Sequence, residues 1–297
     1  MANLKDIRKR IDSVENTKKI TRAMKMVATA KLRRAEEAMK SSRPYANEIR
    51  RVIASLADRV DEEAHPLLEQ RELPETALII VVSTDRGLCG SFNANLFRRL
   101  DDFIKTHEVA DERIDIANIG EKGLRNFRRH EDVEVVRDYE GVIGDVDYDG
   151  ARAIAQDGIQ AFRRGDYDNI YLAYNEFVSA IQYEQIIEPF LPISIDALVD
   201  EDEEGDQPGG VDTDYIYEPD ELSLLDYALP RHLEVQVLQA LLESAAAEQA
   251  ARMTAMDNAT ENAEEMIEDL TLEFNRARQA AITNEIMEIV SGAEAME

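Results

Sequence analysis

The chain has 297 residues and a formal net charge of −28 at pH 7, with 44% hydrophobic residues and one cysteine. A single cysteine excludes an internal disulfide and is typical of a protein from a reducing compartment. The N-terminus is charged and the apolar runs are too short to span a bilayer, so we expect a soluble chain without a signal peptide that could still dock on a membrane complex.

The first 43 residues contain neither Gly nor Pro and predict a long helix. Its apolar residues recur every three or four positions from Leu4 to Met39, the spacing of a coiled-coil seam, with polar interruptions at Lys18, Thr21 and Lys25. Residues 1–60 carry 16 Lys/Arg and 7 Asp/Glu, so this helix is a basic rod on an acidic chain. Its aromatic content is one tyrosine, and we therefore expect no nucleic-acid binding.

The middle of the chain, residues 75–228, alternates strand and helix patterns and is long enough to bury its own core. This βαβ rhythm predicts an open, Rossmann-like α/β sheet. Two further strands are expected near its end, with antiparallel pairing at the sheet edge. The predicted strands are residues 78–82, 114–119, 133–136, 170–174, 182–187 and 214–217, and the predicted helices are residues 94–105, 122–129 and 151–164.

An acidic run covers residues 196–226, with 13 Asp/Glu and no Lys or Arg. Its centre, residues 199–213, is predicted to be a solvated, disordered insertion. Two explanations of the overall acidity stay open, adaptation to a high-salt cytoplasm and an ordinary acidic surface. Solubility and stability that were indifferent to molar salt would exclude the first.

The last long segment, residues 231–291, has 61 residues without Gly or Pro and predicts a helix of roughly 90 Å. Its seam runs from Val235 to Leu270, includes Met266, and is interrupted by Gln249 and Arg252. Two such helices with a domain between them most simply pair antiparallel. The predicted fold is therefore α/β plus coiled coil, with the α/β domain of residues 75–228 inserted between an N-terminal helix (1–60) and a C-terminal helix (230–297).

Motifs for chemistry are nearly absent from the sequence. It contains no Gly-x-x-x-x-Gly-Lys-Ser/Thr phosphate loop and no Gly-x-Gly-x-x-Gly, and its four His lack metal-ligand spacing. Cys89 follows the first strand, where a nucleophile could lie, but no His is placed to activate it, and Gly87 and Gly90 are explained by a tight turn. We expect no catalytic residue, cofactor or metal.

Several motifs resemble the γ subunit of F-type ATP synthases, in order along the whole chain. The acidic run near residues 200–210 departs from that family's pattern. The matching motifs are Ile11-Asp-Ser-Val-Glu-Asn-Thr-Lys-Lys-Ile-Thr-Arg-Ala-Met-Lys-Met-Val-Ala28, Ser83-Thr-Asp-Arg-Gly-Leu-Cys-Gly-Ser-Phe-Asn93, Arg252-Met-Thr-Ala-Met-Asp-Asn-Ala-Thr-Glu-Asn-Ala263, Asn275-Arg-Ala-Arg-Gln-Ala-Ala281 and Ile282-Thr-Asn-Glu-Ile-Met-Glu-Ile-Val-Ser-Gly-Ala-Glu-Ala295.

The resemblance implies a rotor stalk of a proton-translocating ATP synthase, present once per complex and without a nucleotide site of its own. The end helices would stand inside a ring of α and β subunits, and the α/β domain would pack with the ε subunit and the membrane c-ring. The location implied is peripheral, at the cytoplasmic face of the cell (inner) membrane.

Carried over residue by residue, the family pattern also implies contacts with the catalytic ring. A C-terminal set would meet the β subunits and an N-terminal set would face them at a similar level. Without the resemblance, solvated helix faces explain the same residues. The sets are Arg278, Gln279, Thr283 and Glu285, and Lys18, Lys19, Met24 and Lys25. Two alternatives stay open, an α/β enzyme with oligomerising helical ends and a static coiled-coil scaffold.

Overall fold

The computed structural model describes residues 4–56, 65–71, 74–106, 113–130, 133–194 and 221–294. The predicted acidic insertion (199–213) and the predicted strand at 214–217 lie outside these described residues. The chain forms two compact units. The larger unit is Lys31–Ala251, and the smaller one combines Met1–Ala30 with Arg252–Glu297.

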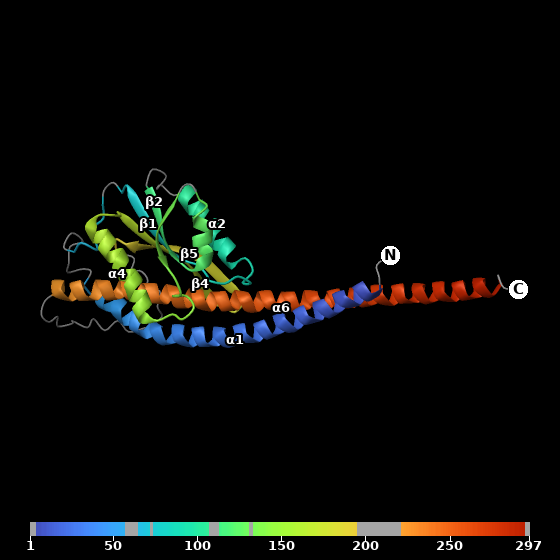
Figure 1. Cartoon of the computed structure of the whole chain (residues 1–297). Helices are drawn as coiled ribbons and strands as arrows, with labels where there is room; N and C mark the ends of the chain where they lie inside the picture. The colour runs from blue at the N-terminus through green and yellow to red at the C-terminus, as the bar shows by residue number, and fades with distance from the viewer. Residues whose placement is uncertain are drawn as a thin grey trace. The chain divides into compact units, whose positions relative to one another are not determined.

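The larger unit contains a five-stranded sheet in the order β3-β2-β1-β4-β5 (Figure 1). Strands β1 to β4 pair in parallel, whereas β5 pairs antiparallel with β4 at the edge. Each strand predicted within the described residues is present, and the expected antiparallel edge is confirmed. The strands are β1 (Thr76–Val82), β2 (Arg113–Ile119), β3 (Glu134–Tyr139), β4 (Asn169–Ser179) and β5 (Gln182–Leu191).

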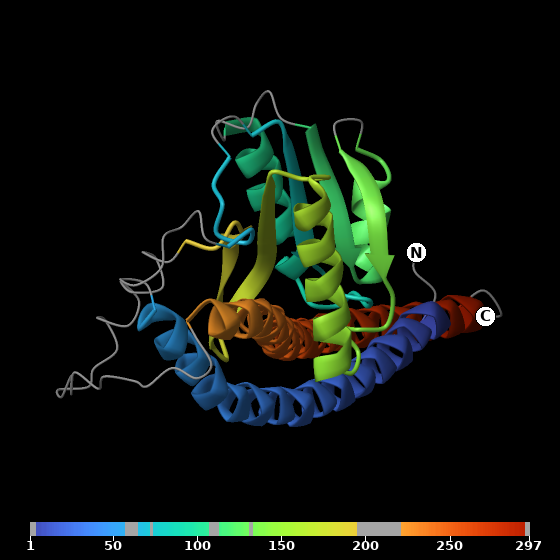
Figure 2. The same cartoon turned by 90° about the vertical axis from the view of Figure 1, so that its left-hand side faces the viewer.

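Helices cover both faces of this sheet (Figure 2). On one face, Ile79 and Val81 of β1 share a core with α2 (Phe92–Thr106) and α3 (Glu121–Phe127). On the other face, Leu78 and Ile80 share a core with α4 (Tyr148–Arg164) and part of α6 (Glu221–Glu294). Because β1 is buried on both sides, it is a continuous apolar run in sequence rather than an alternating one.

Each long helix continues through a proline at which the sequence predicts a helix limit. Helix α1 (Leu4–Ala54) contains Pro44, and α6 contains Pro230. A proline inside a helix costs about 3 kcal/mol. Beside Pro230, Leu229 and Leu233 are buried, so burial of apolar side chains offsets that cost in α6. The domain limits at residues 60, 75, 228 and 230 stay predictions.

Glu234 of α6 is buried against α4 and fully hydrogen-bonded. Its Oε1 accepts from Gln156 Nε2 (2.7 Å), and its Oε2 accepts from Arg231 Nη1 (2.9 Å) and from the Tyr148 hydroxyl. Tyr148, Arg152 and Gln156 are four residues apart, so they lie on one face of α4. Burial alone raises the pKa of Glu234, but the hydrogen bonds outweigh it and hold the pKa below its usual value. Glu234 therefore joins α4 to α6 as a carboxylate.

Asp168 lies just before β4 and is hydrogen-bonded both to the start of β1 and to Arg71, which precedes β1. Burial alone raises its pKa, but hydrogen bonds from the backbone of Glu75, the side chain of Arg71 and both donors of Thr76 lower it to about 2. A carboxyl with a depressed pKa stabilises the fold above its ordinary value of 3.8 and loses that effect as the pH falls towards 2.

We therefore expect the melting temperature of the full chain to fall between pH 4 and about pH 2, and to fall less in Asp168→Asn. The exposed Asp149 provides the matched control, and Asp149→Asn should follow the wild-type curve. Circular dichroism melts across this range measure the effect. Parallel curves for wild type and Asp168→Asn would contradict this role.

Candidate functional site

In the smaller unit, helices α1 and α6 pair antiparallel through a ladder of polar side chains. From one pair to the next, the residue numbers rise along α1 and fall along α6, so the two helices run in opposite directions. The interrupted seam predicted from sequence therefore has a physical explanation, because its polar positions bond across the helix pair. The rungs are Lys18 Nζ to Glu264 Oε1 (2.8 Å), Thr21 Oγ1 to Thr260 Oγ1 (2.7 Å) and Lys25 Nζ to Asp257 Oδ1 (2.5 Å).

The apolar seam of this unit is buried or half-buried, with one correction. Ile7, Met256, Ala263 and Leu270 are buried as expected. Met266, predicted in the seam, is 52% exposed and is wrongly assigned. The three-four repeat that starts at Met256 and passes through Thr260 and Ala263 continues at residue 267, which turns Met266 outward.

The N-terminal set of predicted contact residues divides in two. Lys18 and Lys25 point to α6, and the hydrogen bond and charge of Lys18 lower the pKa of Glu264. Lys19 is exposed and Met24 is half-buried. Lys18 and Lys25 thus have an intramolecular role, whereas the subunit contacts of all four residues stay a prediction.

The C-terminal set is exposed on α6. Arg278, Gln279, Thr283 and Glu285 all lie at the surface, and the Thr283 hydroxyl donates to the Gln279 carbonyl (2.9 Å). With a rise of 1.5 Å per residue, Arg278 lies about 20 Å along α6 from the last rung at Glu264. The structure therefore places the two predicted sets in one unit but at different levels. Their roles as partner contacts stay a prediction.

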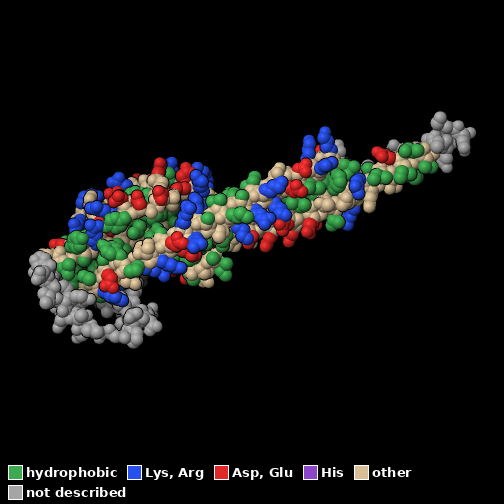
Figure 3. All heavy atoms as spheres, turned by 90° about the horizontal axis from the view of Figure 1, so that it is seen from below, with side chains coloured by type: hydrophobic (Ala, Val, Ile, Leu, Met, Phe, Trp, Pro, Cys, Tyr) green, Lys and Arg blue, Asp and Glu red, His purple; other side chains and the backbone are tan. Residues whose placement is uncertain are grey.

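Sequence reasoning missed a group of apolar residues at the end of α6, which we call the apolar tip. If the rungs continue at the same register, Leu4 at the described start of α1 lies opposite about residue 278. Beyond that point no described residue of α1 lies opposite α6, and Figure 3 shows hydrophobic side chains on its surface. The apolar tip comprises Ile282, Ile286, Met287, Ile289 and Val290, which are between 47% and 71% exposed.

The apolar tip points to a binding surface. Exposed apolar patches mark interaction sites, and a short helix without a partner is only marginally stable in water. The signal in the sequence was the four-three spacing of Ile282, Ile286 and Ile289. This apolar pattern lies beyond the point at which the N-terminal helix can pair with the C-terminal one.

In the larger unit, Cys89 and Gly120 have structural explanations. Cys89 is buried beside Phe92 and Ala247, and its Sγ accepts from Asn93 Nδ2 (3.6 Å), which favours packing over nucleophilic attack. Gly120 has a φ of 91°, and a Cβ there would lie 2.4 Å from the Ser83 carbonyl oxygen, so the turn requires glycine. Among the described residues, His, Cys, Asp and Glu form no group suited to a metal ion. No described helix has the length and apolar character to cross a membrane.

Comparisons with known proteins agree along the entire chain. A family model described as ATP synthase matches residues 3–296. The ATP synthase gamma chain of Salinibacter ruber is 48% identical over 306 residues, covering 100% of this chain and 99% of the relative. The gamma chain of Geobacter metallireducens is 44% identical over 296 residues, with the same coverage.

Solved structures show the same fold. The central stalk and c-ring structure of the Tetrahymena thermophila mitochondrial ATP synthase contains a chain 25% identical, with a TM-score of 0.59 over 81% of this chain and 99% of that one. A chain of the Euglena gracilis mitochondrial ATP synthase rotor is 21% identical, with a TM-score of 0.64 over 94% of this chain and 98% of that one. The predicted architecture, an α/β domain between two long helices, is confirmed.

Proposed function

Because the chain belongs to the ATP synthase gamma chain family, we propose that it is the central rotor-stalk subunit of a proton-translocating F-type ATP synthase. It couples rotation of a membrane ring to ATP synthesis or hydrolysis on β subunits and itself carries no catalytic site. The observation that carries the proposal is the apolar tip, a helix end that needs a surrounding partner.

The coupling follows from symmetry. One asymmetric shaft cannot make the same contacts with three equivalent β subunits, so their equivalence is lost. Each shaft angle favours a different set of β conformations, and the nucleotide affinity of each subunit follows by population shift. Rotation of the shaft thereby exchanges torque for the free energy of ATP binding and release.

The helix pair supports this role mechanically. One ion crossing the membrane supplies about 2.3 kcal/mol per 100 mV, so several crossings must be pooled for each ATP. Pooling requires a connecting element that holds its shape under load. The polar rungs between α1 and α6, with Thr21 buried among them, fix how the two helices pair in the smaller unit.

The partners proposed are the α and β subunits around the helix pair, and the ε subunit and c-ring beside the α/β domain. In this arrangement Arg278, Gln279, Thr283 and Glu285 supply polar contacts next to the apolar tip. In the N-terminal set, Lys19 is exposed and Met24 is half-buried, so both have surface to offer a partner. Lys18 and Lys25 form the rungs to α6 and are also proposed as contacts. The proposed location is peripheral, on the cytoplasmic face of the inner membrane.

A truncation tests the proposal. A chain that ends at Glu273 keeps all three rungs but lacks the polar set and the apolar tip, whereas a chain that ends at Ser291 keeps both. Each is co-expressed with the organism's own α, β and ε subunits and purified through β. We expect the shorter chain to be lost from the complex and the longer one to be retained. Retention of the shorter chain, with full ATP-driven proton pumping, would refute the proposal.

A point-mutant arm tests the polar set separately. We expect Arg278→Ala with Gln279→Ala to weaken assembly or the ratio of protons pumped to ATP hydrolysed, because polar contacts with the catalytic ring are lost. Arg276→Ala, an exposed arginine one half-turn away, provides the matched control. Unchanged assembly and pumping in the double variant would count against the contact roles, while leaving the test of the tip intact.

A further inference from the structure

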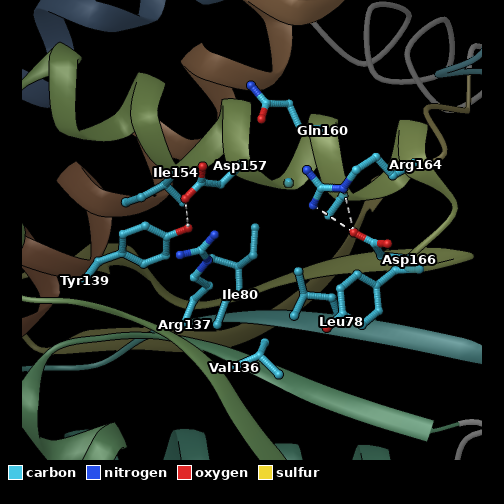
Figure 4. Close-up of a pocket in the computed structure, with 14 residues that line it drawn as sticks. Leu78, Ile80, Val136, Arg137, Tyr139, Ile154, Asp157, Gln160, Arg164 and Asp166 are labelled. Atoms are coloured by element: carbon cyan, nitrogen blue, oxygen red, sulfur yellow. Dashed lines mark hydrogen bonds and ion pairs between the residues drawn. The ribbon is translucent and has the colours of Figure 1, made fainter.

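Within the larger unit, a hollow of about 200 Å³ lies between helix α4 and strands β1 to β3 (Figure 4). Its floor is apolar and formed by side chains of the sheet and of α4, among them Leu78, Ile80, Ala117 and Ile154. Pockets for drug-sized ligands measure about 300–1,000 Å³, so this one suits a smaller molecule. Neither the helix pair nor the apolar tip uses it.

A β-bulge directs one arginine into this hollow. Ile116 of β2 pairs with Val135 and Ala117 pairs with Arg137, so Val136 is an extra residue in β3. Bulges redirect neighbouring side chains, and here both Val136 and Arg137 line the hollow. Figure 4 shows the Arg137 guanidinium directed from β3 into the space below α4.

Arg137 has no ion-pair partner in the described part of the chain, unlike the second arginine at the hollow. Arg164 is neutralised by Asp166, with Nη2 and Oδ2 2.7 Å apart. A guanidinium that points into a hollow with an apolar floor and is unpaired within the described residues is available to an incoming carboxylate.

The opposite wall offers a carboxylate. Asp157 of α4 accepts a hydrogen bond from the Tyr139 hydroxyl at Oδ2 (2.9 Å), and its Oδ1 has no hydrogen-bond partner among the described residues. Burial, followed by the bond to Asp157, raises the pKa of Tyr139, so the tyrosine stays a neutral donor at physiological pH. Asp157 thus keeps Oδ1 as an acceptor for a ligand.

These charges select the ligand. The hollow has two arginines and two aspartates, so a simple anion would gain at Arg137 but be repelled by Asp157. A zwitterion can place its carboxylate at Arg137 and its ammonium group at Asp157, and an apolar side chain can pack on the floor. We propose that the hollow binds a small zwitterion with an apolar side chain, of the class of the aliphatic α-amino acids.

Three probes of matched shape test this on the isolated full chain. They are L-leucine, 4-methylpentanoate, which lacks the ammonium group, and 3-methylbutylamine, which lacks the carboxylate. In calorimetric titrations we expect L-leucine to bind about tenfold or more tightly than either, because each missing charge removes a charge-assisted hydrogen bond. No binding of L-leucine at about 10 mM, or equal binding of the three probes, would overturn the proposal.

Variants locate the site. Arg137→Ala and Asp157→Asn should each weaken L-leucine binding about tenfold or more, whereas Arg125→Ala, an exposed arginine on α3 outside the hollow, should not. Circular dichroism melts check that each variant is folded. Unchanged affinity in Arg137→Ala would also overturn the proposal. These titrations do not involve the ATP synthase, so their outcome is independent of the rotor role.

Discussion

Replacement of Glu234 by alanine is expected to lower the free energy of unfolding of the larger unit by about 2–3 kcal/mol. The side chain is 2% exposed and accepts hydrogen bonds from Tyr148 and Gln156 of α4 and from Arg231 of α6. Its removal leaves the positive charge of Arg231 without its carboxylate and the half-buried donors of Tyr148 and Gln156 without an acceptor. Urea denaturation of the full chain, followed by circular dichroism, measures the change.

Glu234→Gln is the matched comparison. The amide keeps the shape and one acceptor but not the charge, so we expect a smaller loss than with alanine. Combining Arg231→Ala with Glu234→Ala should cost less than the sum of the two single losses, because the pair is removed together. A loss below about 1 kcal/mol for Glu234→Ala would show that α4 and α6 do not depend on this network.

Glu243→Gln is expected to stabilise the chain at pH 8 and to leave it nearly unchanged at pH 5. Burial, then the charge of Glu176 on β4 and that of Glu188 on β5, raise the pKa of Glu243 to about 7, against a smaller lowering by Arg43 of α1. Its Oε2 is buried and has no hydrogen-bond partner among the described residues. The ionised form is therefore poorly accommodated in the fold.

The sign of the pH dependence follows from the raised pKa. The folded chain binds this proton more tightly than the unfolded chain, whose value is near 4.5, so stability falls as the pH rises from about 4.5 to about 7. Allowing for partial exposure, the effect is on the order of 1–2 kcal/mol. Thermal melts of wild type and Glu243→Gln at pH 5 and pH 8 measure it. Glu261→Gln, at an exposed carboxylate of α6, is the control, and equal gains in both variants would refute the assignment.

The sequence predicted the elements of the sheet because their patterns are local. Leu78 to Val82 is a continuous apolar run, and such runs reveal a strand buried on both faces. The helix limits predicted at Pro44 and Pro230 are wrong, because both helices continue through these prolines. At Pro230 the continuation depends on burial of flanking residues, such as Leu229, against distant elements. The cost of a proline can be read from sequence, whereas the packing that offsets it cannot.

The candidate site was predicted only in part. The family motifs pointed to Arg278 and Gln279, and both are exposed as a contact role requires. The apolar residues beside them, such as Ile286, resemble an ordinary seam until the position of the other helix is known. The orientation of Arg137 toward the hollow could not be predicted from the sequence either. It depends on a bulge in β3, and a one-residue insertion leaves no mark in the hydrophobic pattern.

The bond between Thr21 and Thr260 also limits how the smaller unit can yield under load. Sliding the helices by seven residues would keep a lysine opposite a carboxylate, Lys25 against Glu264, but would set the Thr21 hydroxyl against the side chain of Ile267. The slip would also set Lys18 against Thr271, so one of the two ion pairs would be lost together with the Thr21–Thr260 hydrogen bond, and the three rungs together favour the native alignment. The rungs therefore oppose sliding of α1 along α6, so a load applied along one helix is passed to the other.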